Sequence, residues 1–471
     1  MVRSSDKGSI LVDVITALAL SALFISLLTQ ATIESRDIFE RAKVRNDLLD
    51  AYILNEQKIN SLLPYQSLSI QFEQGSTTGI LNASASWYGN DRIETIVKLT
   101  SFLLSFRKQD ISFDDIRSHP FSSTEKSVGQ ALCSVDFLHD RSVSTSSIVL
   151  PINSSIPLTH LEVRNNIAYI STDSTNTPDP DLFIVDIASS TNTKIISSIN
   201  TGPGLSTFSL VGNRIYAAAA STVAQLHIIR LDSLNSPVLE TKYQLNLPYA
   251  TATPPYASAI FFHGNKIYLG TEKWIGPEFS IIDVSDPLKL IELGHTEINS
   301  KINDIFIRDN YAYLATANAK QFMVLNISNP SSPSEIDSYN PSGYSRQEGK
   351  TLSFFEDGLN GGRTSGGFDI TQDHELFYWN KSPTTTNSFV STLISSQNIP
   401  GGVYGVIPDR KHIFLATRQT GKELQIFSQE LSTSTPITYS LPIIPQSMTC
   451  DGNKLYILAA DKPQIYVITS K

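Results

Sequence analysis

The stretch Gly264-Asn265-Lys266-Ile267-Tyr268, followed by Phe279-Ser280-Ile281-Ile282-Asp283, contains the pattern that decides the fold. A Gly-Asn pair precedes a strand centred on an aromatic residue, and a further short apolar strand comes next. Asn and Gly accept the positive φ that two-residue hairpin turns require. The pattern therefore predicts short antiparallel strands joined by tight turns.

The same pattern occurs seven times after residue 142. Its hairpins are Arg164–Tyr169, Gly212–Tyr216, Gly264–Tyr268, Asp309–Tyr313, Asp373–Phe377, Asp409–Phe414 and Gly452–Tyr456. The aromatic markers that end these hairpins lie 47, 52, 45, 64, 37 and 42 residues apart. A period of about 40–50 residues with four short strands is typical of propeller blades. We therefore expect a seven-bladed β-propeller; a β-helix would need shorter repeats, and a pair of sandwiches would not keep this register.

The segments Val284-Ser285-Asp286-Pro287 and Ile327-Ser328-Asn329-Pro330 resemble the LVIVD-type propeller repeats of bacterial surface proteins. This resemblance implies a structural repeat and assigns no catalytic residue. The last repeat ends at Tyr466–Lys471 and leaves no residues for a fourth strand. Because an open sheet edge favours aggregation, we expect residues 144–152 to supply the missing strand and close the ring.

The amino-terminal region follows a different pattern. After Arg3 and Lys7 the chain is apolar from Ile10 to Leu28, and Asp13 is the one charged residue within that run. Nineteen helical residues span about 28 Å, close to the hydrocarbon thickness of a bilayer. A carboxylate costs about 2.5–3.5 kcal/mol in the middle of such a helix, so Asp13 is expected to have a function.

The residues Lys7-Gly8, Ser9 and Asp13 resemble the leader and mature start of type IV prepilins and pseudopilins. The resemblance implies cleavage after Gly8 by a prepilin peptidase, methylation of Ser9, and pairing of Asp13 with the amino terminus of a neighbouring subunit. The family usually has Glu at the position of Asp13 and an aromatic residue or Met at that of Ser9. A cleaved secretory signal and a plain signal anchor are the alternatives. The apolar run is longer than the core of a secretory signal, and a plain signal anchor gives Asp13 no role.

Residues 9 to 63 contain no glycine or proline, which predicts one long helix whose segment 10–28 lies in the membrane or the filament core. Strands are expected at 67–72, 79–87 and 92–104. The fold class is therefore mainly β, with a long amino-terminal α-helix and a small pilin-like α+β head before the propeller. The expected domains are leader 1–8, helix 9–63, head 64–107, linker 108–141 and propeller 142–471.

Composition and motifs give no indication of nucleic-acid binding or of catalysis. The 471 residues carry a net charge of −9, and no basic patch suits nucleic acid. The chain has no phosphate loop, no nucleophile elbow and no zinc spacing, so we expect neither an enzyme nor a bound cofactor. Its two cysteines, Cys133 and Cys450, allow one disulfide.

Three groups of side chains could in principle form sites. His160, His263, His374 and His412 lack metal-ligand spacing and are interpreted as surface or turn histidines. Asp173, Asn176, Asp179 and Asp181 are a weak candidate for a hard-cation loop, with an Asx/Pro turn as the alternative. The segment 339–367, which accounts for the 64-residue spacing, is predicted to be an inserted ligand loop or a disordered excursion. Its candidate ligand residues are Tyr344, Phe354 and Phe355.

The combined prediction is a minor pilin-like subunit of a type IV pilus or related pseudopilus, with the propeller as a recognition or adhesion head at the filament tip. Its partners would be other pilin subunits, the prepilin peptidase, the inner membrane before assembly, and an unknown surface glycan or protein. It would be inserted in the bacterial cytoplasmic membrane and then displayed on the pilus or cell surface. The alternative is a membrane-anchored periplasmic or extracellular propeller enzyme or scaffold.

Overall fold

The computed structural model describes the strands 67–74, 77–88, 92–102 and 108–112, and residues 143–470 except 174–178, 247–254, 318–319, 342–346, 356–357, 366–372, 410–411, 429–434 and 452–453. The chain divides into two compact units, residues 1–88 with 92–121 and residues 89–91 with 122–471. The predicted leader, long helix and membrane span lie outside the described residues. Within the described part, no helix is long and apolar enough to cross a membrane.

The first unit contains a four-stranded antiparallel sheet in chain order, made of β1 (Ser67–Gln74), β2 (Thr77–Tyr88), β3 (Arg92–Phe102) and β4 (Lys108–Ser112). The three predicted strands are present. The predicted linker is wrong at its start, because β4 pairs with β3 and places Leu99 opposite Ile111. The sequence of β4 has one apolar residue, Ile111, and therefore lacks the alternation that identifies a strand.

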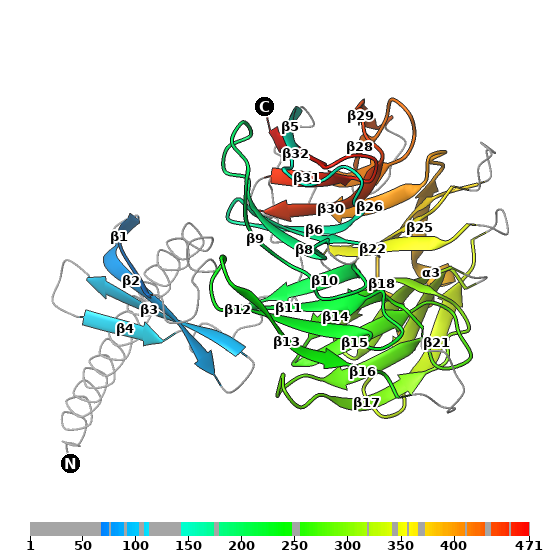
Figure 1. Ribbon diagram of the computed structural model, residues 1–471, viewed down its shortest axis with the longest axis horizontal. Coiled ribbons are helices and arrows are strands. Elements are labelled where there is room, and N and C mark those ends of the chain that lie inside the picture. Colours follow the sequence, from blue (N-terminus) through cyan, green and yellow to red (C-terminus); the bar gives the residue numbers. More distant parts are fainter. Residues whose placement is uncertain are drawn as a thin grey trace, which may run out of the picture. The chain divides into compact units, whose positions relative to one another are not determined.

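The second unit is a seven-bladed β-propeller in which each blade is a four-stranded antiparallel sheet (Figure 1). Blades 1 and 2 comprise β6 (Leu158–Arg164), β7 (Ile167–Thr172), β8 (Leu182–Asp186) and β9 (Lys194–Ile199), then β10 (Leu205–Val211), β11 (Arg214–Ala219), β12 (Leu226–Leu231) and β13 (Pro237–Tyr243). Blades 3 and 4 comprise β14 (Ala257–His263), β15 (Lys266–Thr271), β16 (Phe279–Asp283) and β17 (Ile291–Thr296), then β18 (Ile302–Arg308), β19 (Tyr311–Thr316), β20 (Phe322–Asn326) and β21 (Ser334–Tyr339).

Blades 5 and 6 comprise β22 (Gly349–Phe355), β23 (Gly358–Arg363), β24 (Leu376–Trp379) and β25 (Leu393–Gln397), then β26 (Val403–Pro408), β27 (His412–Thr417), β28 (Leu424–Ser428) and β29 (Ile437–Tyr439). A one-turn helix, α3 (Phe389–Thr392), precedes β25 and is capped by Ser388. Blade 7 comprises β30 (Pro445–Asp451), β31 (Lys454–Ala459), β32 (Gln464–Ser470) and β5 (Val143–Val149).

The ring closes through β5, as predicted. This strand precedes blade 1 in sequence but pairs with β32, with Ile148 opposite Ile465 and Ser147 opposite Tyr466. The first strand of each blade contacts the first strand of the next, and β30 contacts β6. These seven first strands are therefore the innermost ones and surround the propeller axis.

The strand directions define two faces of the propeller. Because each blade is antiparallel, the hairpins between first and second strands lie on one face. The crossovers, which lead from the fourth strand of one blade to the first strand of the next, lie on the opposite face together with the turns between second and third strands. We call the latter the crossover face.

The hairpin turns use the backbone conformation that the sequence predicted. Asn165 and Asn166 have φ of 52° and 60°, and Gly264 and Asn265 have φ of 56° and 61°. Two successive residues with positive φ are the signature of a type I′ turn, whose twist matches that of the flanking strands. The prediction that these Asn and Gly residues serve the turn geometry is confirmed.

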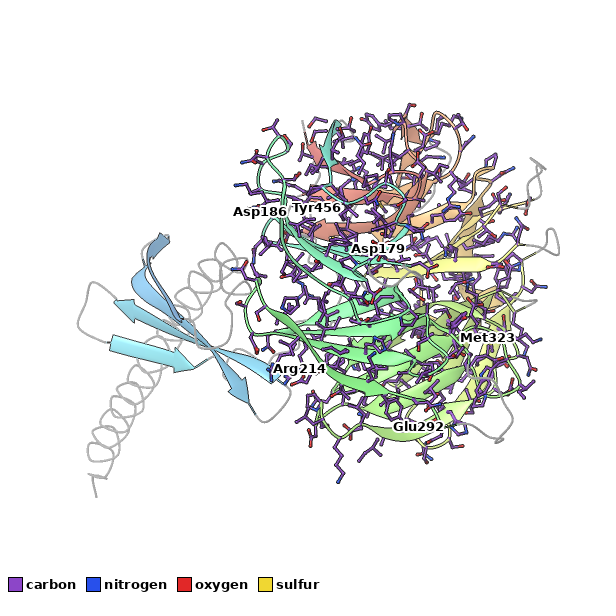
Figure 2. The ribbon with its side chains drawn as sticks, in the orientation of Figure 1. Asp179, Asp186, Arg214, Glu292, Met323 and Tyr456 are labelled. Atoms are coloured by element: carbon purple, nitrogen blue, oxygen red, sulfur yellow. The ribbon has the colours of Figure 1, made fainter. Side chains whose placement is uncertain are left out.

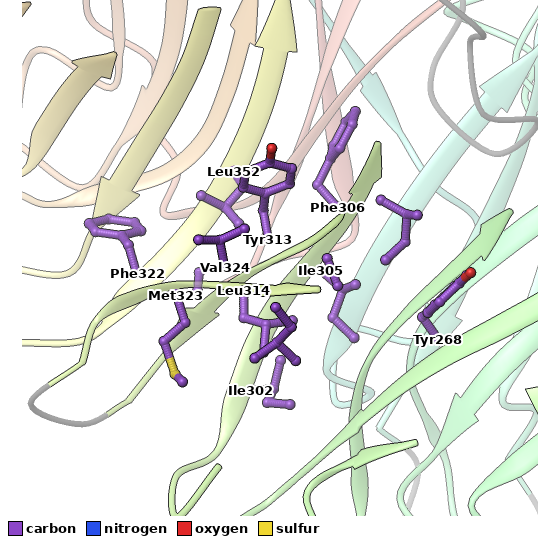
Figure 3. Packing of buried hydrophobic residues seen from close by; sticks show 14 of the residues in the cluster. Tyr268, Ile302, Ile305, Phe306, Tyr313, Leu314, Phe322, Met323, Val324 and Leu352 are labelled. Carbon is purple, nitrogen blue, oxygen red and sulfur yellow. The ribbon is translucent and has the colours of Figure 1, made fainter. Parts of the chain in front are cut away.

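Apolar side chains from facing blades fill the space between them. In the largest cluster, Tyr313, Leu314 and Val324 of blade 4 pack with Ile305 and Leu352, the latter from blade 5 (Figure 3). Fully burying such a side chain contributes about 1.5–3 kcal/mol. Because each interface uses side chains from two sheets, no blade has a complete core of its own.

Blade 5 corrects the sequence interpretation. The predicted inserted loop contains the strands β22 and β23, and the predicted hairpin Asp373–Phe377 leads into the third strand, β24. The position equivalent to the aromatic markers is Asn360, on β23. A Cβ on the neighbouring Gly361 would lie 2.8 Å from the ring of Phe322 and 2.9 Å from that of Trp379. The second strand of this blade thus lacks the aromatic marker, and Phe377 on the third strand occupied its place in the sequence pattern, which shifted the apparent repeat.

A buried polar residue lies directly before the third strand of six blades. These crossover-binding residues are Asp181, Gln225, Glu278, Gln321, Glu375 and Glu423, and each is at most 6% exposed. Their side chains hydrogen-bond the backbone of the following crossover: Glu278 accepts from the N–H groups of Ile298 and Asn299 at 2.8 and 2.9 Å. They therefore attach each blade to the start of the next.

The two cysteines are only partly described. Cys450 on β30 is fully buried and disulfide-bonded, and the described residues include no free cysteine. Cys133, the other cysteine of the sequence, lies outside the described residues.

Ring closure by β5 can be tested by truncation. A chain starting at Pro157 lacks β5 and leaves the edge of β32 unpaired, whereas a chain starting at Asp140 keeps it. We expect the shorter chain to aggregate, or to unfold at a temperature lower by more than about 5 °C, because an entire strand pairing is lost. Thermal unfolding followed by circular dichroism makes the comparison, and equal midpoints for the two chains would refute the role assigned to β5.

Candidate functional site

Every innermost strand contains one residue that has no partner in the register with the second strand. These bulge residues are Thr159, Ser206, Ser258, Asn303, Lys350, Tyr404 and Gln446. Each is the second residue of its strand and so lies near the crossover face. A β-bulge redirects a side chain, and bulges are frequent next to functional sites.

In the first four blades the bulge residue ties its blade to the next. Thr159 Oγ1 donates to the carbonyl of Leu205 at 2.6 Å, and Ser206 Oγ donates to that of Ala257 at 2.7 Å. Ser258 and Asn303 make the equivalent bonds to the carbonyls of Ile302 and Gly349, at 2.7 and 2.8 Å. Small hydroxyl and amide side chains at this position thus have a structural explanation.

Blades 5 to 7 depart from this pattern, with Lys350, Tyr404 and Gln446 at the bulge. Arg418, which directly follows β27, lies over the ring of Tyr404, with its Cζ 3.7 Å from the ring centroid. Its Nε donates to the carbonyl of Pro445 at 3.1 Å, and a terminal nitrogen donates to Gln446 Oε1, also at 3.1 Å. Arg418 therefore makes the bond to blade 7 that a bulge residue makes elsewhere.

Lys350, Tyr404, Arg418 and Gln446 form a continuous group across three blades, which we call the axial cluster. The Lys350 ammonium lies 6.0 Å from the centroid of the Tyr404 ring. All four side chains are half-buried. Within the described residues, neither Lys350 nor Arg418 forms an ion pair with a carboxylate. The cluster thus has two cations and no direct counterion.

The charges around the axial cluster affect its protonation. Burial lowers the pKa of Lys350, and the neighbouring cations Lys301 and Arg418 lower it more than Asp304 and Glu348 raise it. Lys301 is itself paired with Glu272 at 2.6 Å. The field at Lys350 is therefore dominated by positive charge.

A second, fully buried polar group lies between blades 4 and 5. Arg363, with no exposed side-chain surface, pairs with Asp373 at 2.5 Å, and Gln347 Nε2 donates to Asp373 at 2.8 Å and to Glu375 at 3.2 Å. Glu375 also accepts from the N–H of Ile399 at 2.6 Å. The two carboxyl groups share Arg363 as their one cationic neighbour in this group. Burial together with the charge of Asp373 raises the pKa of Glu375 to about 8. Hydrogen bonds join these side chains to one another and to the backbone of the crossover, which indicates a structural role.

The residues predicted from sequence have different outcomes. Gly8, Ser9, Asp13, Tyr344 and Asn176 lie outside the described residues. Phe354 and Phe355 lie on β22 rather than in a loop, so their predicted location is wrong; whether they bind a ligand stays a prediction. Phe354 packs 4.4 Å from Phe306 and 4.9 Å from Tyr313, measured between ring centroids.

The weak cation-loop candidate is not assembled by its described members. The carboxylate of Asp181 accepts from Thr201 Oγ1 at 2.9 Å and from the N–H of Gly202 at 2.7 Å, so it holds the crossover. Asp173 is exposed, and Asp179, labelled in Figure 2, is half-buried in the β7–β8 connection. Among the residues that the structure describes, no group of three His, Cys, Asp or Glu side chains could hold a metal ion.

The four predicted turn or surface histidines do not converge on one site. Burial lowers the pKa of His160 to about 4, and its ring lies edge-on to Phe208 with centroids 5.0 Å apart. His374 Nδ1 lies 2.5 Å from Ser396 Oγ, and the N–H of His412 donates to Asp409 at 2.6 Å.

The axial cluster was not predicted from the sequence. The sequence feature that could have indicated it is the bulge position of the repeat. This position has Thr, Ser or Asn in blades 1 to 4 but Lys350, Tyr404 and Gln446 in blades 5 to 7. Alignment of this position required the correct strands of blade 5, which the sequence pattern placed wrongly. Arg418 could not be found this way, because it lies outside the repeated position.

Comparisons with known proteins support the propeller and one repeat. Residues 301–341, which contain blade 4, match the LVIVD repeat family model. The chain resembles a catalytically inactive virginiamycin B lyase from Staphylococcus aureus solved with quinupristin, with a TM-score of 0.51, 12% identity, and coverage of 70% of this chain and 100% of that one. It also resembles Raptor from Chaetomium thermophilum, with a TM-score of 0.50, 11% identity, and coverage of 69% and 28%. No curated protein matches the chain. Identities this low show the fold alone.

Replacing Glu375 should change how stability depends on pH. The folded protein holds the Glu375 proton up to about pH 8, whereas the unfolded chain releases it near the ordinary glutamate pKa of 4.5. The stability that this carboxyl contributes is therefore complete below pH 4.5 and is lost as the pH rises toward 8, by up to about 1.4 kcal/mol per pH unit. Glu375→Gln mimics the protonated form, and urea unfolding should show it gaining roughly 1–4 kcal/mol on the wild type between pH 5 and pH 8.

The matched control is Glu335→Gln, which changes an exposed glutamate paired with Lys320 at 2.6 Å. We expect the difference between this variant and the wild type to be the same at both pH values. A pH profile of Glu375→Gln that runs parallel to that of the wild type would contradict the protonated state assigned to Glu375.

Proposed function

We propose that this chain is a surface-displayed subunit whose propeller is a non-catalytic recognition module. The observation that carries the proposal is the axial cluster on the crossover face. There the bulge positions of three adjacent blades do not have the Thr, Ser or Asn side chains that tie blades together elsewhere, and two cations have no carboxylate partner among the described residues. Such a departure from an otherwise regular repeat fits ligand binding better than packing.

The amino-terminal region is assigned to assembly. We infer a minor subunit of a type IV pilus or related pseudopilus from the resemblance of Lys7-Gly8, Ser9 and Asp13 to prepilins. The chain inserts in the bacterial cytoplasmic membrane and is cleaved after Gly8 by a prepilin peptidase. The segment 10–28 then packs against other pilin subunits, and the propeller is displayed at the surface.

The size of the propeller favours a position at the filament tip. Packed helices lie about 8–10 Å apart, which limits the room for each subunit's head. A domain of roughly 330 residues has a radius of gyration of about 20 Å and thus a diameter of roughly 50 Å. Heads of this size on every subunit would collide, whereas one head at the tip meets no neighbour above it.

Processing is tested by mass spectrometry of the mature amino terminus. Gly8→Ala should block cleavage, because the peptidase subsite must accept a residue without a side chain. Asp13→Ala is the matched control: it should be cleaved normally but should enter filaments poorly, because the neighbouring amino terminus loses its charged partner. A mature chain that starts anywhere but Ser9 would exclude the pilin interpretation and favour an anchored propeller.

The tip position is tested by immunogold labelling of intact filaments with an antibody against the propeller. We expect a single terminal cluster of label, and label confined to the cell body in the Gly8→Ala strain. Continuous label along the shaft would defeat the tip assignment while leaving membership of the filament intact.

A further inference from the structure

The axial cluster has more hydrogen-bond donors than the protein satisfies. A guanidinium has five N–H groups, and Arg418 uses two of them in its bonds to Pro445 and Gln446. An ammonium has three N–H groups, and among the described residues none of those of Lys350 meets an acceptor. Six N–H groups on two neighbouring cations therefore point to solvent or to a ligand.

The nearby carboxylates are occupied elsewhere. Asp304 accepts from the N–H groups of Ile305 and Leu352, at 2.9 and 2.7 Å, and Glu348 accepts from Asn303 Nδ2 at 3.1 Å. Neither lies within ion-pair distance of Lys350. Two like charges held near one aromatic ring repel each other, and a bound anion would relieve that repulsion.

We propose that the axial cluster binds an oxyanion, a carboxylate or a phosphate or sulfate group, between Lys350 and Arg418. The bond from Arg418 to Pro445 fixes the guanidinium, so little side-chain freedom is lost when the anion binds. Arg418 stacks on the ring of Tyr404, with its Cζ 3.7 Å from the ring centroid, and the Lys350 ammonium lies 6.0 Å from the same centroid, so both cations are held beside one aromatic side chain. The proposal names the ligand class of the recognition module and rests on that proposed function.

The test uses the full chain and three probes: inorganic phosphate, sulfate and acetate, each titrated calorimetrically at pH 7 and constant ionic strength. Binding of at least one probe is expected, and binding of none would overturn the proposal. Preference for phosphate or sulfate over acetate would identify a phosphorylated or sulfated ligand, and the reverse order would identify a carboxylate. Lys350→Met and Arg418→Gln should each weaken binding by about tenfold or more.

The control variants separate a specific site from general attraction. Lys289→Met removes an exposed lysine from the β16–β17 connection, on the opposite face, and should leave affinity unchanged. Lys350→Arg keeps the cation and should retain most of the affinity. Thermal unfolding checks that each variant is folded. A loss of anion affinity in Lys289→Met equal to that in Lys350→Met, or full affinity in Lys350→Met, would show an adventitious ion only and overturn the assignment.

Proton uptake gives a readout that a purely structural role would not produce. Burial and the neighbouring cations lower the pKa of Lys350, and a bound anion raises it again, so binding should take up protons when the titration is repeated at a pH between these two pKa values, above pH 7. Calorimetry in two buffers of different ionisation enthalpy measures this uptake, which should disappear in Lys350→Met. Anion binding by a chain that never enters filaments would keep this site and refute the filament proposal. Tip labelling without anion binding would refute this site and keep the filament proposal.

Discussion

The propeller depends on the hydrogen bonds that attach one blade to the next. A crossover must turn from the outer edge of one sheet to the axis of the next, and its N–H groups cannot all join a strand ladder. The crossover-binding residues supply the missing partners: Glu423 accepts from the N–H of Leu441 at 2.8 Å, and Gln225 accepts from that of Leu245 at 3.0 Å. A buried N–H left without a partner costs about 1–3 kcal/mol, so removal of one such side chain affects two blades at once.

The bulge residues add a second connection closer to the axis. Where Thr, Ser or Asn lies at the bulge, the side chain bonds the next innermost strand and has no donor left for a ligand. Where Lys350 and Tyr404 lie there, this bond is not made, and Arg418 supplies the equivalent bond at the next interface from another strand end. The connection between blades 6 and 7 is therefore preserved, while N–H groups of Lys350 and Arg418 become available to a ligand. The candidate site arises because one arginine takes over a structural bond that the repeat normally makes.

Most of the strands could be predicted from the sequence, but little of the site could. Turn residues such as Asn265 and apolar runs such as Phe279–Asp283 depend on local chemistry, which the sequence displays directly. Closure by β5 was predictable because a three-stranded last repeat leaves an open edge. Blade 5 was placed wrongly because its second strand has Asn360 at the marker position, next to Gly361, whose close approach to the ring of Phe322 from another blade leaves no room for a side chain. A contact between distant residues decided that strand, and no local pattern records it.

The site was missed for a related physical reason. Strand periodicity assigns alternate residues to opposite faces, and a bulge breaks this alternation at the residue whose side chain matters most. Moreover, Arg418 and Gln446 meet across blades 6 and 7, and blade 7 contains both ends of the propeller chain. The packing of blade 6 on blade 7 and the bond from Leu441 to Glu423 place Pro445 and Gln446 beside Arg418, and these contacts exist only between neighbouring blades. The geometry of the axial cluster is thus a property of three adjacent blades and of no single repeat, which is why no repeat taken alone could indicate it.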